Sequence, residues 1–174
     1  MGFSEEARRM FVEMGFHSTW REENDPVPLQ VEMLVSKIDG RDVSVHGDMY
    51  QFSIEVPFST PPHLRGVSIS TAFGRPRTGR FAPTGEARFD HHFSISAETV
   101  EIAQAASATL SRGARDALLD LVPHLYSLLV RDGRIIMYTL DRDSQADFVI
   151  PYITEKRFPE RLVELAKVLE TGSL

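Results

Sequence analysis

Alternating apolar and polar positions predict strands over much of the first half of the chain. Every second residue is apolar across 29–35, and the alternation resumes at 43–45 after the pair Asp39-Gly40. It returns across 52–56 and again across 67–73. A period of two buries one face of a strand, and an Asp-Gly pair between two such runs is typical of a tight hairpin. This half is therefore predicted to be an antiparallel meander with one covered face.

The stretch TGEARFDHHFSI (84–95) is predicted to place a strand at the centre of the core. Phe89, His91, Phe93 and Ile95 alternate with polar residues, so we expect a strand over 89–95 that buries both phenylalanines. In that strand His91 is half-buried between the two aromatic rings. Asp90 and His92 share the opposite face and point to solvent.

Apolar residues three and four positions apart predict helices elsewhere. A first helix begins after Ser4 and stops at Gly15, and a final helix covers about 156–170, with Pro159 tolerated in its first turn. An alanine-rich helix over 97–110, capped by Ser96, is followed by a second piece over 112–122. Residues 16–28 are interpreted as a connector.

The segment after Pro123 is predicted to be a second hairpin. A helix continuing through this proline would cost about 3 kcal/mol, and the Asp132-Gly133 pair lies between two β-forming runs. We therefore expect strands over 125–131 and 134–140, followed by an extended edge piece or loop over 147–153. Together these helices and strands predict one α+β domain over residues 1–174. Its mainly antiparallel sheet has helices packed on one face and a helix at each end.

Composition narrows the classes of protein that the chain can belong to. The 42% apolar fraction is typical of a globular domain, and the absence of cysteine excludes disulfides and cysteine-based zinc sites. The net charge of −6 argues against nucleic-acid binding. No apolar run reaches the 18 or so residues of a membrane span, and no signal peptide is evident. We expect a soluble, cytoplasmic protein without membrane insertion or bound nucleic acid.

An arginine-rich loop is the first candidate for a binding site. Residues 74–85 (GRPRTGRFAPTG) contain Arg75, Arg77 and Arg80. Clustered guanidinium groups suit a carboxylate, a phosphate or an acidic protein surface. The alternative is a solvated loop whose arginines pair with the protein's own carboxylates.

The single tryptophan is the second candidate. Trp20 can anchor a partner at an exposed surface, or it can cover one edge of the core, which is the interpretation that we favour at this point.

Two function classes follow. The first is a noncatalytic interaction or scaffold module that binds an acidic protein partner through the 74–85 loop or an exposed sheet edge, with homo-oligomerisation left open. The second is a small enzyme or ligand-binding protein with a pocket near Asp90 and His92. No G-x-S-x-G, H-E-x-x-H, Walker or dinucleotide motif occurs, so we expect no catalytic residues, metal or cofactor.

The order of several landmarks resembles a loosely defined group of bacterial proteins of unknown function. They are a helix end over 7–16, I-D-G-R-x-V-x-V (38–45), T-G-E-x-x-F-D-x-x-F-x-I (84–95) and L-V-x-D-G-x-I (129–135). Members of that group often carry transmembrane helices, which this chain lacks, and Ser36 stands where a glycine is expected. The resemblance implies one continuous α+β domain and supplies no catalytic residues.

Overall fold

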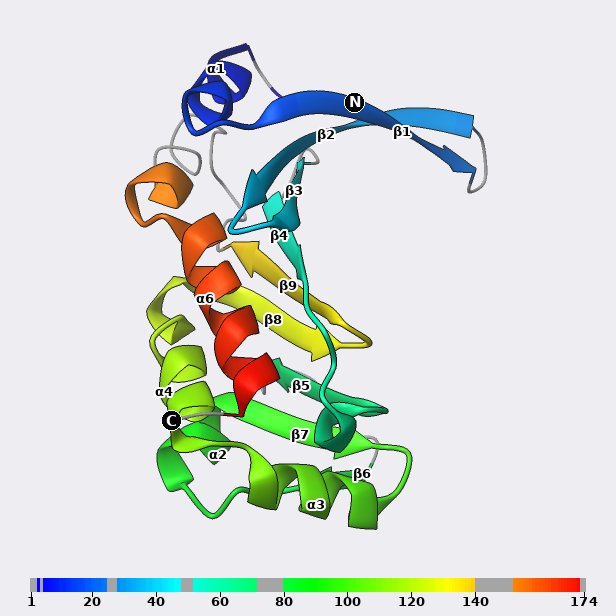
Figure 1. The fold of residues 1–174 in the computed structure, drawn as a ribbon, viewed down its shortest axis with the longest axis vertical. Helices are drawn as coiled ribbons and strands as arrows, with labels where there is room; N and C mark the ends of the chain where they lie inside the picture. The colour runs from blue at the N-terminus through cyan, green and yellow to red at the C-terminus, as the bar shows by residue number, and fades with distance from the viewer. Residues whose placement is uncertain are drawn as a thin grey trace.

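The computed structural model describes residues 3, 5–24, 28–47, 52–71, 80–139 and 152–172. Across these ranges the chain is an α+β protein, as predicted, with an open nine-stranded antiparallel sheet in the order β1-β2-β3-β4-β9-β8-β5-β7-β6. Helices line one side of this column of strands (Figure 1). The strands are β1 (His17–Asn24), β2 (Pro28–Ile38), β3 (Arg41–Gly47), β4 (Phe52–Pro57), β5 (Val67–Thr71), β6 (Arg80–Ala82), β7 (Phe93–Ala97), β8 (Leu125–Arg131) and β9 (Arg134–Thr139).

Two Asp-Gly turns confirm both predicted hairpins. At Asp39-Gly40 both residues have positive φ (49° and 79°), as they do at Asp132-Gly133 (49° and 76°). Two consecutive positive φ values match the twist of antiparallel strands, and glycine adopts them without strain. The β8–β9 hairpin inserts between β4 and β5, so the sheet is not a simple meander in chain order.

The helices cover one face of the sheet. They include α1 (Glu5–Glu13), α2 (Ala87–His92), α3 (Val100–Thr109), α4 (Arg112–Leu119) and α6 (Phe158–Thr171), together with the short 3-10 turns η1 (Pro62–Leu64) and η2 (Val122–His124). The apolar stripe of α6 is buried as predicted, and Pro159 lies at its first turn. Among the described residues, no helix is long and apolar enough to cross a bilayer.

The core lies between these helices and the sheet. Side chains that alternate along the central strands are buried, such as Ile54 and Val56 on β4 and Ile135 and Met137 on β9. Their neighbours on each strand point to the other face. Among the described residues that other face carries no helix. In this part of the chain one face of the sheet is therefore covered by helices and the other is open.

The predicted strand over 89–95 is wrong in its first half. Residues 87–92 form α2, and only β7, from Phe93, is extended. Phe89 and Phe93 are both buried, with stacked rings 5.2 Å apart, because residues four apart share a face in a helix as well as in a strand. His91 is exposed rather than half-buried. Asp90 and His92 no longer share a face, because α-helical positions two apart diverge.

Other boundaries also differ from the predictions. Residues 17–24, interpreted as a connector, form strand β1. Of the piece predicted to be extended, 147–153, residues 152 and 153 are helical and 147–151 lie outside the described residues. The alanine-rich helix begins later than expected, because Ser96 belongs to β7 and Thr99 Oγ1 accepts the capping hydrogen bond from Ile102 N (3.2 Å).

Candidate functional site: an arginine-lined hollow at one end of the sheet

A shallow hollow of about 440 Å³ lies where strands β5 to β8 meet the first turns of α3. Pairing aligns Val67, Ala97 and Arg80 across β5, β7 and β6, and it brings Ser68 beside Ser96. The lining residues are Gly66, Ser68, Arg80, Ser96, Ala97, Glu98, Ile102, Arg131 and Asp132.

Arg80 is the central charged group of this hollow. Its guanidinium donates to the backbone carbonyl of Glu98 (Nη1 to O, 2.8 Å), and the residue is exposed. Within the described ranges no carboxylate lies in salt-bridge range of it, so its positive charge is not neutralised by an ion pair. A guanidinium held in place by one carbonyl keeps further donors for an incoming anion.

The second arginine is partly neutralised. Arg131 Nε donates to the carboxylate of Asp132 at 2.8 Å across the start of the β8–β9 turn, and both side chains are exposed. An exposed pair of neighbours contributes little to stability, so it can rearrange at small cost when an acidic group arrives. Ile102, 40% exposed, supplies an apolar rim.

Half-buried serines cover the open face of the sheet beside this hollow. Their hydroxyls sit at alternate positions on β3, β4, β5, β7 and β8, and pairing places Ser70 opposite Ser94 and Ser68 opposite Ser96. The serines are Ser44, Ser53, Ser68, Ser70, Ser94, Ser96 and Ser127. Their hydroxyls give this face hydrogen-bonding groups, beside the larger side chains of Glu55, Ile136 and Tyr138 that share it. The repeated S-I-S at 68–70 and 94–96 was the signal that the sequence reasoning missed.

Of the predicted binding residues, the structure describes Arg80 and Trp20, which lie on the two opposite edge strands of the sheet. Arg75 and Arg77 lie outside the described residues, and Arg80 lies in the hollow. Trp20 is on β1 at the opposite edge of the sheet, with 55% of its surface exposed. It therefore does not cover the core, and the interpretation that we favoured from the sequence is wrong.

Asp90, on α2, holds the loop that precedes this helix. Its carboxylate accepts hydrogen bonds from Thr84 N (2.8 Å), Thr84 Oγ1 (2.8 Å) and Gly85 N (3.0 Å). These bonds occupy the group that the enzyme hypothesis would need for chemistry. Burial lowers the pKa of His92, and the nearby His91 and Arg88 lower it further. Within the described residues no cluster of three potential ligands for a metal ion occurs.

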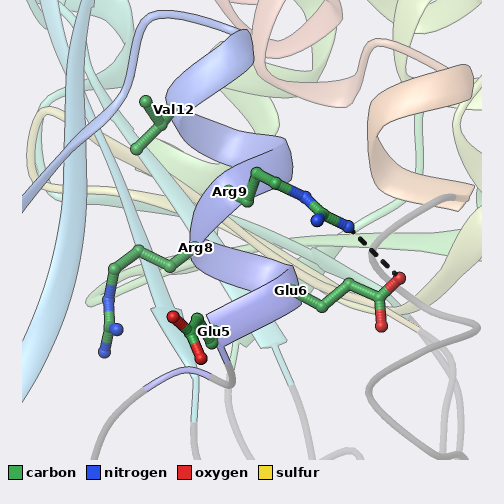
Figure 2. Close-up of a pocket in the computed structure, with 5 residues that line it drawn as sticks. All are labelled: Glu5, Glu6, Arg8, Arg9 and Val12. Carbon is green, nitrogen blue, oxygen red and sulfur yellow. Dashed lines mark ion pairs between the residues drawn. The ribbon is translucent and has the colours of Figure 1, made fainter.

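A second hollow, of about 690 Å³, runs along the outer face of α1 (Figure 2). Figure 2 shows Arg9 extending toward Glu6, to which it pairs at 3.8 Å, while Arg8 points to the other side of the helix. Among the described residues its lining comes from α1, with Val12 as the one apolar side chain. Because both arginines are paired with carboxylates, Arg9 with Glu6 and Arg8 with Glu32, this surface is a weaker candidate than the hollow at Arg80.

Arg8 belongs to a buried network that sequence reasoning did not find. The carboxylate of Glu32, with a side chain only 1% exposed, accepts from Arg8 Nε (2.7 Å), Arg8 Nη2 (2.9 Å), Ser18 Oγ (2.6 Å) and Phe3 N (2.9 Å). Hydrogen bonding from Arg8 is the main cause that lowers the pKa of Glu32 to about 2. The network fastens α1 to β1 and β2.

Comparison with known proteins supports the architecture alone. No protein-family model matches the sequence, and no curated protein matches it significantly, so the resemblance noted from the sequence stays a prediction. Among solved structures, the mycobacterial trehalose monomycolate transport factor A, TtfA, superposes with a TM-score of 0.56 at 10% identity. The match covers 90% of this chain and 92% of that one. At this identity the likeness shows that the two chains share a fold.

Proposed function

We propose that this chain is a noncatalytic interaction module that binds an acidic partner at the hollow around Arg80. The observation that carries the proposal is the state of Arg80. Its guanidinium is exposed, is positioned by the carbonyl of Glu98, and has no carboxylate partner among the described residues. A positioned but unneutralised guanidinium is suited to a carboxylate, which it can bind through two parallel hydrogen bonds.

The surroundings of Arg80 favour a peptide over a small ion. The hollow is shallow and combines the hydroxyls of Ser68 and Ser96 with the apolar surface of Ala97 and Ile102. An acidic side chain with an apolar neighbour would match this mixture, whereas a small ion would leave the apolar part uncovered. Arg75 and Arg77 precede β6 by a few residues, so a partner could engage them as well.

Neither the fold comparison nor the Asp90 region favours a second function. TtfA is named a transport factor, and at 10% identity we take from it the fold and no substrate. The enzyme hypothesis required Asp90 for chemistry, and its carboxylate already accepts three hydrogen bonds from Thr84 and Gly85. A cytoplasmic location, expected from the sequence, stays a prediction.

Binding of a fluorescein-labelled Asp/Glu-rich peptide, followed by fluorescence anisotropy, tests the proposal. Arg80→Glu should weaken binding by about tenfold or more, since a charge-assisted hydrogen bond contributes roughly 1.5–3 kcal/mol. Binding should also weaken with added salt. Arg112→Glu makes the same charge change on α4, where the side chain is 84% exposed, and should leave the affinity nearly unchanged.

The matched Asn/Gln peptide is the ligand control and should not bind. Equal losses for Arg80→Glu and Arg112→Glu would indicate a nonspecific charge effect and contradict the proposed site. No binding of the acidic peptide to the native chain, even at low salt, would also contradict it. In that case the arginines would be solvated surface residues.

A further inference from the structure

Among the described residues, strand β1 ends the sheet and leaves one of its backbone edges without a partner. β1 pairs with β2 along its whole length, and no described strand follows it on the other side in the sheet order. In Figure 1 β1 and β2 extend as an arm beyond the other strands, and β1 forms the upper margin of the sheet. A long edge of unpaired N–H and C=O groups is a template for another strand, which proteins usually shorten or cover.

This edge lacks the proline, the glycine and the short length that commonly prevent pairing, while Arg21, Glu22 and Glu23 give it charged positions. β1 is eight residues long and contains no proline or glycine, whereas the opposite edge strand, β6, has three residues. Its middle carries Trp20, which is 55% exposed. An exposed tryptophan on an unpaired strand is typical of an interface anchor.

We propose that two copies of the chain pair antiparallel along β1 and extend the sheet across a twofold axis at Trp20. A twofold axis normal to a sheet keeps every side chain on its own face. A residue can therefore oppose only itself, or residues an even number of positions away, in the other copy. Few pairing registers satisfy this condition.

Only two of these registers pair seven residues of β1 in each copy. One joins residues 17–23 of both copies and places Trp20 opposite Trp20; the other joins 18–24 and places Arg21 opposite Arg21. Like charges directly opposite are destabilising, whereas aromatic pairs are stabilising. The first register is therefore preferred, because it pairs the two Trp20 rings and avoids placing Arg21 opposite Arg21.

The remaining pairs in this register are also compatible. Thr19 faces Arg21, and Ser18 faces Glu22, so no like-charged side chains stand directly opposite each other among these residues. This fit of the edge to itself argues for a second copy rather than an unrelated extended peptide. The inference does not depend on the hollow around Arg80, which lies at the other end of the sheet and would stay exposed in both copies.

The single tryptophan makes the interface directly observable. Dilution of the native protein should shift Trp20 emission to longer wavelength as the rings enter water, in parallel with a change from dimer to monomer in analytical ultracentrifugation. Trp20→Glu should be monomeric, with an unchanged far-UV circular dichroism spectrum. Val100→Glu, at another exposed apolar residue, should remain dimeric. A native protein that is monomeric at its highest soluble concentration would overturn the proposal.

Absence of native cysteine allows the register to be tested without replacing Trp20. Directly opposed residues have Cα atoms about 4.5–5.5 Å apart, within reach of a disulfide. An oxidised mixture of Thr19→Cys and Arg21→Cys, given different tags, should form mixed dimers in clear excess over either self-dimer. Predominant Arg21→Cys self-dimers would indicate the Arg21-centred register. Either that result or the absence of cross-linking would overturn the proposed pairing.

Discussion

At the scale of single residues, hydrogen bonding strongly shifts the pKa of the buried carboxylate of Glu32. A buried acid is normally costly, yet hydrogen bonds from Arg8, Ser18 and Phe3 N satisfy its oxygens. They lower its pKa from 4.5 to about 2. Because the folded pKa lies below the unfolded value, the ionised form contributes stability that is fully present above about pH 4.5.

Glu32→Gln should reduce stability and its dependence on acid. In the native protein the contribution of Glu32 is lost as pH falls from about 4.5 toward 2, and the shift corresponds to up to about 3 kcal/mol. The native and variant unfolding free energies, measured by urea denaturation, should therefore differ most at pH 7 and converge near pH 2. Glu101→Gln, at an exposed residue of α3, is the control. A pH-independent difference would contradict the electrostatic account.

At the scale of elements, α2 explains why periodicity failed in the middle of the chain. Phe89 and Phe93 are four positions apart, and this spacing fits one face of a strand and one face of a helix equally well. The hydrogen bonds that Thr84 and Gly85 donate to Asp90 hold the turn from which α2 starts. Side-chain hydrogen bonding therefore decided between two structures that hydrophobicity could not distinguish.

The edge element β1 was missed for a different reason. Its residues from His17 to Glu22 are mostly exposed on both faces, so no alternation marks the strand. It is extended because β2 continues past the core and offers its own edge for pairing, from His17 opposite Val35 to Asn24 opposite Pro28. A strand formed mainly through backbone pairing leaves little trace in the pattern of side chains.

Gly47→Ala should weaken the β3–β4 ladder. A Cβ on Gly47 would lie 2.7 Å from Phe52 Cε1 and 2.9 Å from Phe3 Cε1, and both rings are packed. Overpacking of this kind typically costs 1–3 kcal/mol. The urea midpoint should fall accordingly, whereas Ser53→Ala on the open face should change it little. An unchanged midpoint for Gly47→Ala would mean that the rings move aside freely.

At the scale of the whole molecule, the C-terminal helix joins distant parts of the chain. Glu170 on α6 accepts from the guanidinium of Arg41 on β3 and from Ser59 N (2.6 Å), and Lys167 contacts Asp39 at 2.7 Å. The Arg41 guanidinium is the main cause that lowers the pKa of Glu170. These contacts hold α6 across the sheet, while the distal part of the β1–β2 arm extends beyond the helices (Figure 1).

Hydrogen exchange should follow this arrangement. Backbone amides of the central strands β4, β8 and β9 should exchange slowest, because helices and neighbouring strands cover them on most sides. Amides of β1 should exchange much faster in the monomeric Trp20→Glu variant than in the concentrated native protein. Mass spectrometry after timed labelling would measure both. Equal protection of β1 in the two samples would argue against pairing along this edge.

The sequence by itself determined those elements whose local chemistry admits one answer. Alternation predicted β2 to β4, Asp-Gly pairs predicted both hairpins, and the apolar stripe predicted α6, because each depends on neighbours in the chain. Only the tertiary structure decided the rest. Strand order, the exposed position of Trp20, the burial of Glu32 and the hollow at Arg80 depend on segments far apart in sequence. Pairing between distant segments is a property of the assembled sheet, so no local pattern can encode it.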